Sequence, residues 1–218
     1  MFNTRFNTIA LAQRDTHGLS VDAQKVALAS ALLWTFRTRT DIYNLLGRMG
    51  LKSEDGRGIT AEMVKTAVQE IKDKKLLIEG PSHAGTFHLA DSLRAPLYRR
   101  LLESAARSEL ADLVAAFDRI DTSRMGYYWS GASQASTVAF VRARLFSGAA
   151  PEEVNRIHDA VGRVMDWNEI ITQAALLGFD GPCFERICAP WRWNLLTRRL
   201  PAFVCTGRRL SCPLPIGR

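Results

Sequence analysis

Apolar residues recur at helical spacing between Thr60 and Asp73. Four of them stand at i, i+3, i+4 and i+7, which places them on one face of a helix: Val64, Ala67, Val68 and Ile71. Thr60 precedes them, and its hydroxyl can cap a helix by accepting a backbone N–H of the first turn. Polar residues occupy the opposite face. The pattern therefore predicts an amphipathic helix with one buried side and one polar side.

The spacing changes after Lys75. A short apolar run, Leu76–Ile78, is followed by residues 80–85 (GPSHAG), which are rich in turn-forming glycine and proline. Thr86–Leu89 then alternates between polar and apolar residues, as a strand with one buried face does. We expect a β-hairpin here, with Leu76 and Leu89 nearer the core. The residues expected to pair across its strands are Leu76, Ile78, Phe87 and Leu89.

Two further helices are predicted upstream. Ser20 can cap the first, whose expected buried stripe is Val26, Ala29, Leu33 and Phe36, with Leu32 and Trp34 at its margins. Thr40-Asp41 begins the second, whose stripe is Ile42, Leu45, Leu46 and Met49. Gly50 is expected to end it. A polar turn, residues 51–58, leads into the amphipathic helix.

Three helices followed by a hairpin is the element order of a winged helix-turn-helix. Residues 19–90 resemble that superfamily in this order and in the run AVQEIKDKKLLIEG, which is similar to the end of the recognition helix in many bacterial winged-helix proteins. The turn at residues 51–58 is longer than a tight helix-turn-helix linker. The resemblance implies a helix that lies in the major groove of DNA. The residues predicted to contact double-stranded DNA are Lys65, Thr66, Gln69, Lys72, Lys75, His83 and Arg39.

Amphipathic helices continue beyond the hairpin, so the fold class is mainly α with a small β-hairpin wing. A helical bundle or a short helix-pair array is expected to follow the winged helix. Residues 134–189 form its helical domain; within it Val164 is assigned to a buried stripe and Asn168 to a helix cap. The predicted divisions are 1–18 (arm), 19–90 (winged helix), 91–121 (linking helices), 134–189 (helical domain) and 190–218 (a basic, proline-containing, poorly ordered tail).

The positive charge of the chain has one source. Lysine and arginine number 29 against 22 acids, a net charge of +7. No acid follows Glu185, whereas seven arginines do, so residues 1–185 are neutral overall. The net charge alone therefore does not indicate a DNA-binding surface on the winged region.

Motifs for catalysis and metal binding are missing from the sequence. The four cysteines are spaced C-x4-C-x16-C-x6-C, unlike the paired arms of a zinc ribbon, and no phosphate-binding glycine motif occurs. We therefore expect no enzyme activity, no metal and no cofactor. The longest apolar stretch, residues 27–36, is too short to span a membrane. We expect a cytoplasmic protein.

Two functions remain open. The first is a DNA-binding transcriptional regulator or DNA-targeting module, acting as a homodimer or within a larger protein machine. The second is a non-catalytic protein–protein interaction scaffold, because winged helices also bind proteins. In that second role the layout and the run LLGFDGPCFERI weakly resemble the amino-terminal, motor-free region of large bacterial helicases of the SWI/SNF type.

Overall fold

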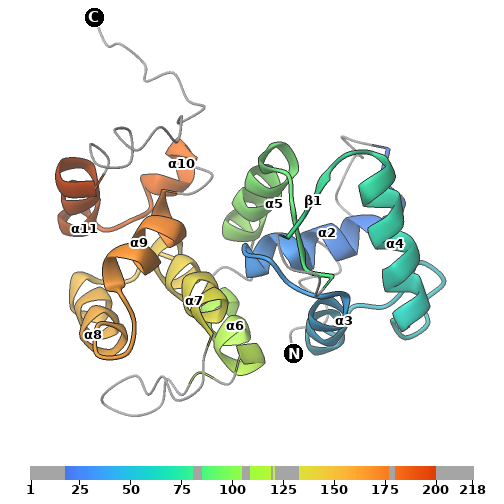
Figure 1. Ribbon diagram of the computed structural model, residues 1–218, viewed down its shortest axis with the longest axis horizontal. Helices are drawn as coiled ribbons and strands as arrows, with labels where there is room; N and C mark the ends of the chain where they lie inside the picture. Colours follow the sequence, from blue (N-terminus) through green and yellow to red (C-terminus); the bar gives the residue numbers. More distant parts are fainter. Residues whose placement is uncertain are drawn as a thin grey trace, which may run out of the picture.

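The chain is mainly helical, with one small antiparallel sheet of two strands (Figure 1). The computed structural model describes residues 18–80, 85–104, 109–118, 120, 133–176 and 180–199. Residues 1–17 of the predicted arm, His83, most of the connector at 121–133 and the end of the tail lie outside these residues. The described elements are α2 (Val21–Leu33), α3 (Arg39–Arg48), α4 (Ala61–Asp73), β1 (Leu77–Glu79), β2 (Phe87–Leu89), α5 (Asp91–Glu103), α6 (Leu110–Asp118), α7 (Gln134–Phe146), α8 (Pro151–Val161), α9 (Trp167–Ala175), α10 (Gly181–Phe184), α11 (Ala189–Asn194) and a π-helical turn at Leu195–Arg199.

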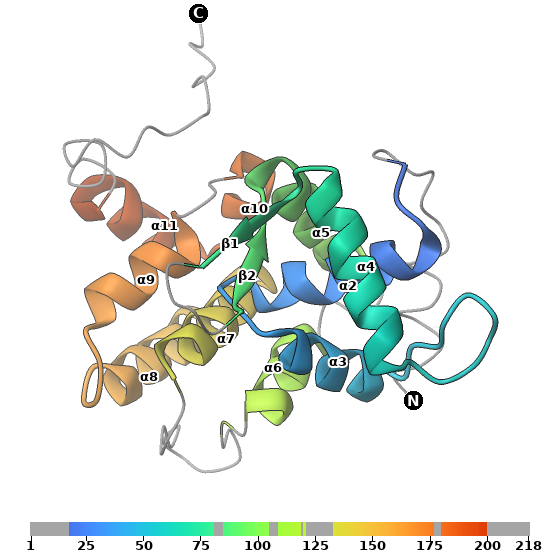
Figure 2. The ribbon, with the colours of Figure 1, turned by 45° about the vertical axis from the view of Figure 1, so that its right-hand side comes forward.

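Helix α2 is the centre of the first half of the molecule, which runs from α2 to α5. Around it pack α3, α4, α5 and β2 (Figure 2). Ser20 caps it by accepting the Ala23 N–H, as predicted. Every side chain from Ala23 to Leu33 is buried, so the helix has no exposed stripe. The expected stripe was wrong at its end. Trp34, at φ 63°, turns the chain out of the helix and is fully buried, whereas Phe36 lies beyond the turn and is 36% exposed.

The next two helices begin at capping threonines. Thr38 and Asp41 form a reciprocal capping box, so α3 starts at Arg39, one residue earlier than expected. Thr60 accepts the Met63 N–H and starts α4 where the sequence predicts it. The apolar face of α4 is buried against α2, and its polar face is thereby turned outward.

The hairpin forms, but its register differs from the prediction by one residue. The cross-strand pairs are Leu77↔Leu89, Ile78↔His88 and Glu79↔Phe87. Phe87 and Leu89 are buried as expected, whereas Ile78 faces outward and is 44% exposed. Side chains alternate between the two faces of a strand, so a shift of one residue exchanges the faces. Three consecutive apolar residues, Leu76–Ile78, contain no alternation that could fix the register.

A single cluster of buried apolar residues runs from Leu19 to Leu195 and joins the hairpin region to the later helices. Within the second half, α7 packs on α6, α8 and α9. Leu97, Val114 and Ile157 are buried on α5, α6 and α8. Two expectations here were wrong. Helix α8 ends at Val161, which leaves Val164 59% exposed, and Asp166 rather than Asn168 caps α9.

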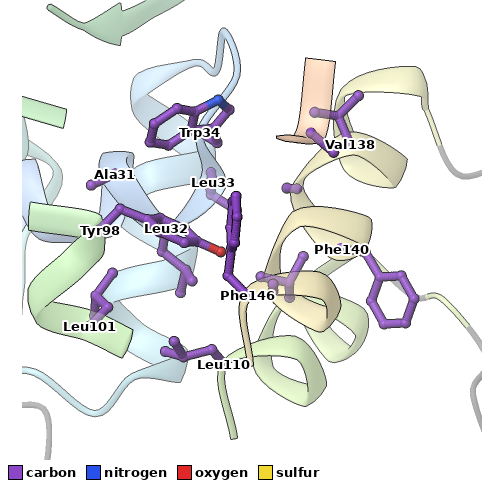
Figure 3. Packing of buried hydrophobic residues seen from close by; sticks show 14 of the residues in the cluster. Ala31, Leu32, Leu33, Trp34, Tyr98, Leu101, Leu110, Val138, Phe140 and Phe146 are labelled. Atoms are coloured by element: carbon purple, nitrogen blue, oxygen red, sulfur yellow. The ribbon is translucent and has the colours of Figure 1, made fainter. Parts of the chain in front are cut away.

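Two arginines are buried where the halves meet. Trp34, Tyr98 and Phe146 point toward one another between α2, α5 and α7 (Figure 3). The Arg142 guanidinium carbon lies 3.3 Å from the Trp34 ring centroid, and its Nη1 donates to the Ala174 carbonyl at 2.5 Å. Arg94 donates to the Trp34 carbonyl at 2.6 Å. Burial lowers the pKa of Arg142 to about 9, so this guanidinium is still charged at neutral pH.

The prediction of an unpacked tail from Pro190 onward was wrong at Trp191 and Leu195. Leu195 is fully buried, and the Trp191 Nε1 donates to the Asn155 Oδ1 at 3.2 Å. The Trp191 and Trp167 rings meet edge to face, with centroids 5.7 Å apart. These anchors act singly over a short stretch, so no period revealed them. Residues 200–218 lie outside the described part.

Candidate nucleic-acid interface

An open groove of about 990 Å³ separates the polar face of α4 from the end of the hairpin. The two elements lie side by side in Figure 2, with the start of α3 close to both. Five of the residues predicted to contact DNA line this groove: Arg39, Lys65, Thr66, Gln69 and Lys72. Lys75, which ends the turn after α4 at φ 59°, is not among the lining residues. His83 cannot be placed, because it lies outside the described residues.

The orientation of α4 follows from its sequence. Val64, Ala67 and Ile71 are buried, and Val68 packs partly buried beside them. The polar residues between them therefore face away from the core. Lys65 and Lys72 are seven residues apart, about two helical turns, on the same face. Side chains of these residues are 60% and 50% exposed, respectively. The groove is therefore bordered by two accessible ammonium groups.

The two lysines and the glutamine on this face each have a partner within the protein. The Lys65 Nζ lies 3.1 Å from the Glu62 Oε1, and the Lys72 Nζ lies 2.6 Å from the Glu79 Oε1 on β1. The Gln69 amide donates to the Asp73 Oδ1 at 2.7 Å. Pairs as exposed as these contribute only about 0.2–1 kcal/mol. An incoming ligand with stronger charge can therefore displace the carboxylates.

The charges lining the groove almost balance. The basic residues are Arg39, Lys65, Lys72 and Lys74, and the acidic ones are Glu70, Asp73 and Glu79, an excess of one positive charge. Glu70 is occupied elsewhere, because its carboxylate accepts hydrogen bonds from the backbone N–H and the hydroxyl of Ser20. Among the described residues no carboxylate forms an ion pair with Arg39. The strongest local opposition to an anionic ligand therefore comes from Asp73 and Glu79.

Reasoning from the sequence missed Glu79 and the apolar part of the groove lining. Val68, Leu77 and Phe87 contribute this apolar part of the lining. Glu79 follows Leu77 by two residues and therefore shares its face of the strand. That signal depends on the hairpin register, and the expected register placed Leu77 and Glu79 on the wrong face.

Comparison with known protein families, with curated proteins and with solved structures gave no match. Within the described ranges, no three His, Cys, Asp or Glu side chains are grouped as metal ligands would be. None of the helices in those ranges is long and apolar enough to cross a bilayer. Besides three carboxylates, the polar lining of the groove consists of ammonium, guanidinium, hydroxyl and amide groups, which can bind phosphates and base edges.

Proposed function

We propose that this protein binds double-stranded DNA through the groove between α4 and the hairpin. Residues 19–90 act in this proposal as a winged helix-turn-helix, with α4 as the recognition helix and β1–β2 as the wing. The observation that carries the proposal is the convergence of Arg39, Lys65, Thr66, Gln69 and Lys72 on one open groove. Lys65, Gln69 and Lys72 share one exposed face of α4, and that helix ends beside the hairpin. A helix that enters a major groove has this kind of arrangement.

The residues take different roles in this proposal. Lys65 and Lys72 neutralise phosphates at the two ends of the contact, and Arg39 adds a third cation from α3. Thr66 and Gln69 lie between the lysines, and the Gln69 amide can pair with adenine in a bidentate manner. Binding requires Lys72 to exchange Glu79 for a phosphate and Gln69 to exchange Asp73 for a base. A transcriptional regulator or DNA-targeting module in the cytoplasm, working as a dimer or within a larger machine, is the corresponding cellular role.

Fluorescence-anisotropy titrations with labelled duplex DNA at several salt concentrations test this proposal. Lys65→Ala and Lys72→Ala should weaken binding to all sequences and reduce the salt slope by about 0.9 per lysine. Gln69→Ala should change the preference between sequences by about 1–3 kcal/mol and leave the slope unchanged. Lys52→Ala is the matched control, because Lys52 is exposed and does not line the groove. Unchanged binding in all the groove variants would refute the proposal.

The distal arginines need separate treatment. Arg208, Arg209 and Arg218 can hold any polyanion without regard to sequence. The titrations are therefore run on the full chain and on a chain ending at Arg199, which keeps the buried Leu195. Affinity that disappears with the distal arginines and does not respond to the groove substitutions belongs to the tail.

A second candidate is a non-catalytic interaction scaffold, which includes the amino-terminal part of a SWI/SNF-type helicase. The polar face of α4 favours this candidate, because its two lysines and its glutamine already pair with Glu62, Asp73 and Glu79. A face with alternating charges suits a protein partner with complementary charges. In this case none of the groove variants alters DNA binding, whereas they weaken the protein complex.

A further inference from the structure

Arg37 is paired through its backbone with Phe87, a residue that lines the groove. Its backbone N–H donates to the Phe87 carbonyl, and the Phe87 N–H donates to the Arg37 carbonyl, both at 2.9 Å. This bridge extends the sheet beyond β2 by one residue. Phe87 lines the groove, as does Arg39, which is two residues along the chain. The position of Arg37 therefore sets the position of both.

The side chain of Arg37 reaches the second half of the protein. Its Nη1 and Nη2 donate to the two carboxylate oxygens of Asp118 at 3.2 and 3.0 Å, and both nitrogens lie 3.4 Å from the Ser136 hydroxyl oxygen. Asp118 is the last residue of α6, and Ser136 is in the first turn of α7. The Arg37 and Asp118 side chains are only 8% and 7% exposed. Solvent and salt consequently screen this pair far less than the pairs on α4.

Two neighbouring contacts reinforce the same link. The Thr35 hydroxyl donates to the Ala135 carbonyl at 3.3 Å, and the Arg48 guanidinium donates to the Ala116 carbonyl at 3.1 Å. The end of α6 and the start of α7 therefore hold the segment before α3 as well as α3 itself.

We propose that Arg37 is a positioning residue through which helices α6 and α7 regulate the groove. The guanidinium is held by Asp118 and Ser136, and the backbone of the same residue holds β2. A partner or ligand that shifts α6 or α7 thereby moves Phe87 and the start of α3. In its effect on DNA binding this inference rests on the proposed function, but the mechanical link does not.

The chemistry makes this link sensitive to small changes. Only a guanidinium offers two parallel N–H donors to a carboxylate, so lysine cannot reproduce the contact. The Asp118 carboxylate lies at the carboxyl end of α6, where the helix dipole disfavours negative charge. Without its cation the carboxylate is buried and uncompensated, which destabilises this contact between the two halves.

Hydrogen exchange of the full chain, without DNA, tests the link directly. In Asp118→Asn the neutral amide keeps the shape and one acceptor but loses the ionic hydrogen bonds. We expect the Arg37 and Phe87 amides to exchange about tenfold faster or more, because charged hydrogen bonds are among the stronger ones in proteins. Amides of α9 should keep their protection. Asp112→Asn is the matched control, since it makes the same change on α6 in an exposed ion pair with Arg144.

The outcomes separate positioning from a purely structural role. Faster exchange confined to Arg37, Phe87 and their neighbours, absent from Asp112→Asn, supports the proposal. A uniform loss of protection throughout the chain, or no change at Phe87, overturns it. Arg37→Lys keeps the charge and removes the two parallel N–H donors. It should give the same local pattern of faster exchange, and it serves as the test if Asp118→Asn does not fold.

DNA titration then tests the regulatory step. Asp118→Asn should weaken duplex binding several-fold while the salt slope stays unchanged, because no phosphate contact is removed. If Asp118→Asn shows the faster local exchange but the wild type does not bind DNA, the proposed function is refuted and the link is intact. Normal DNA affinity in a variant that shows the local exchange would refute regulation through Arg37.

Discussion

Substitution of Phe87 by alanine tests how the hairpin is attached to the core. Phe87 is only 3% exposed, and its ring faces inward with Leu89. Full burial of such a side chain contributes about 1.5–3 kcal/mol. The cavity left by the missing ring raises the expected loss to about 3–5 kcal/mol. Because β2 is held on both edges, by β1 and by Arg37, the strand has little freedom to collapse into the space.

Urea unfolding monitored by circular dichroism measures this loss. We expect a lower midpoint and an unchanged m-value, because the surface exposed on unfolding hardly changes. Ile78→Ala is the control in the same hairpin, and its exposed side chain should cost less than about 1 kcal/mol. A loss below about 1.5 kcal/mol for Phe87→Ala, or an equal loss at Ile78, would refute the register and the burial described above.

A truncation and a substitution probe the second half. A chain ending at Pro190 should be less stable than one ending at Arg199 by about 2–5 kcal/mol, because it lacks the buried Leu195; equal melting temperatures would show that Leu195 anchors nothing. Arg142→Met should change the free energy of unfolding by less than about 1 kcal/mol or increase it, since it removes a buried charge that no acid pairs with among the described residues. A loss of 3 kcal/mol or more in thermal or urea unfolding would mean that the ring contacts and the Ala174 hydrogen bond outweigh desolvation of the guanidinium.

The helices that the sequence predicts best are those with a cap and a strong stripe. Thr60 and the Val64–Ile71 stripe define α4 because both signals are local. The hairpin register is not a local property: it depends on the contact of Leu77 with the core and on the Arg37 bridge. The burial of Trp34 likewise depends on Tyr98 and Arg142, which are far away in the sequence.

The candidate site was predictable in part for the same reason. Lys65, Gln69 and Lys72 share a helical face whatever the tertiary structure, so helical spacing alone groups them. The sequence does not show that Glu79 comes from another element to pair with Lys72. Nor does it show Arg37, whose partners Asp118 and Ser136 are 81 and 99 residues away. Local periodicity carries no information about such contacts.

The Lys72–Glu79 pair offers the most direct test of DNA binding in the groove. Lys72→Ala and Glu79→Gln remove opposite charges at one point, 2.6 Å apart. The proposal predicts effects of opposite sign on duplex affinity at low salt: several-fold weaker binding for Lys72→Ala, and several-fold tighter binding for Glu79→Gln, which frees the ammonium for a phosphate. Affinities that do not change in either variant, or that fall in both, would contradict the account.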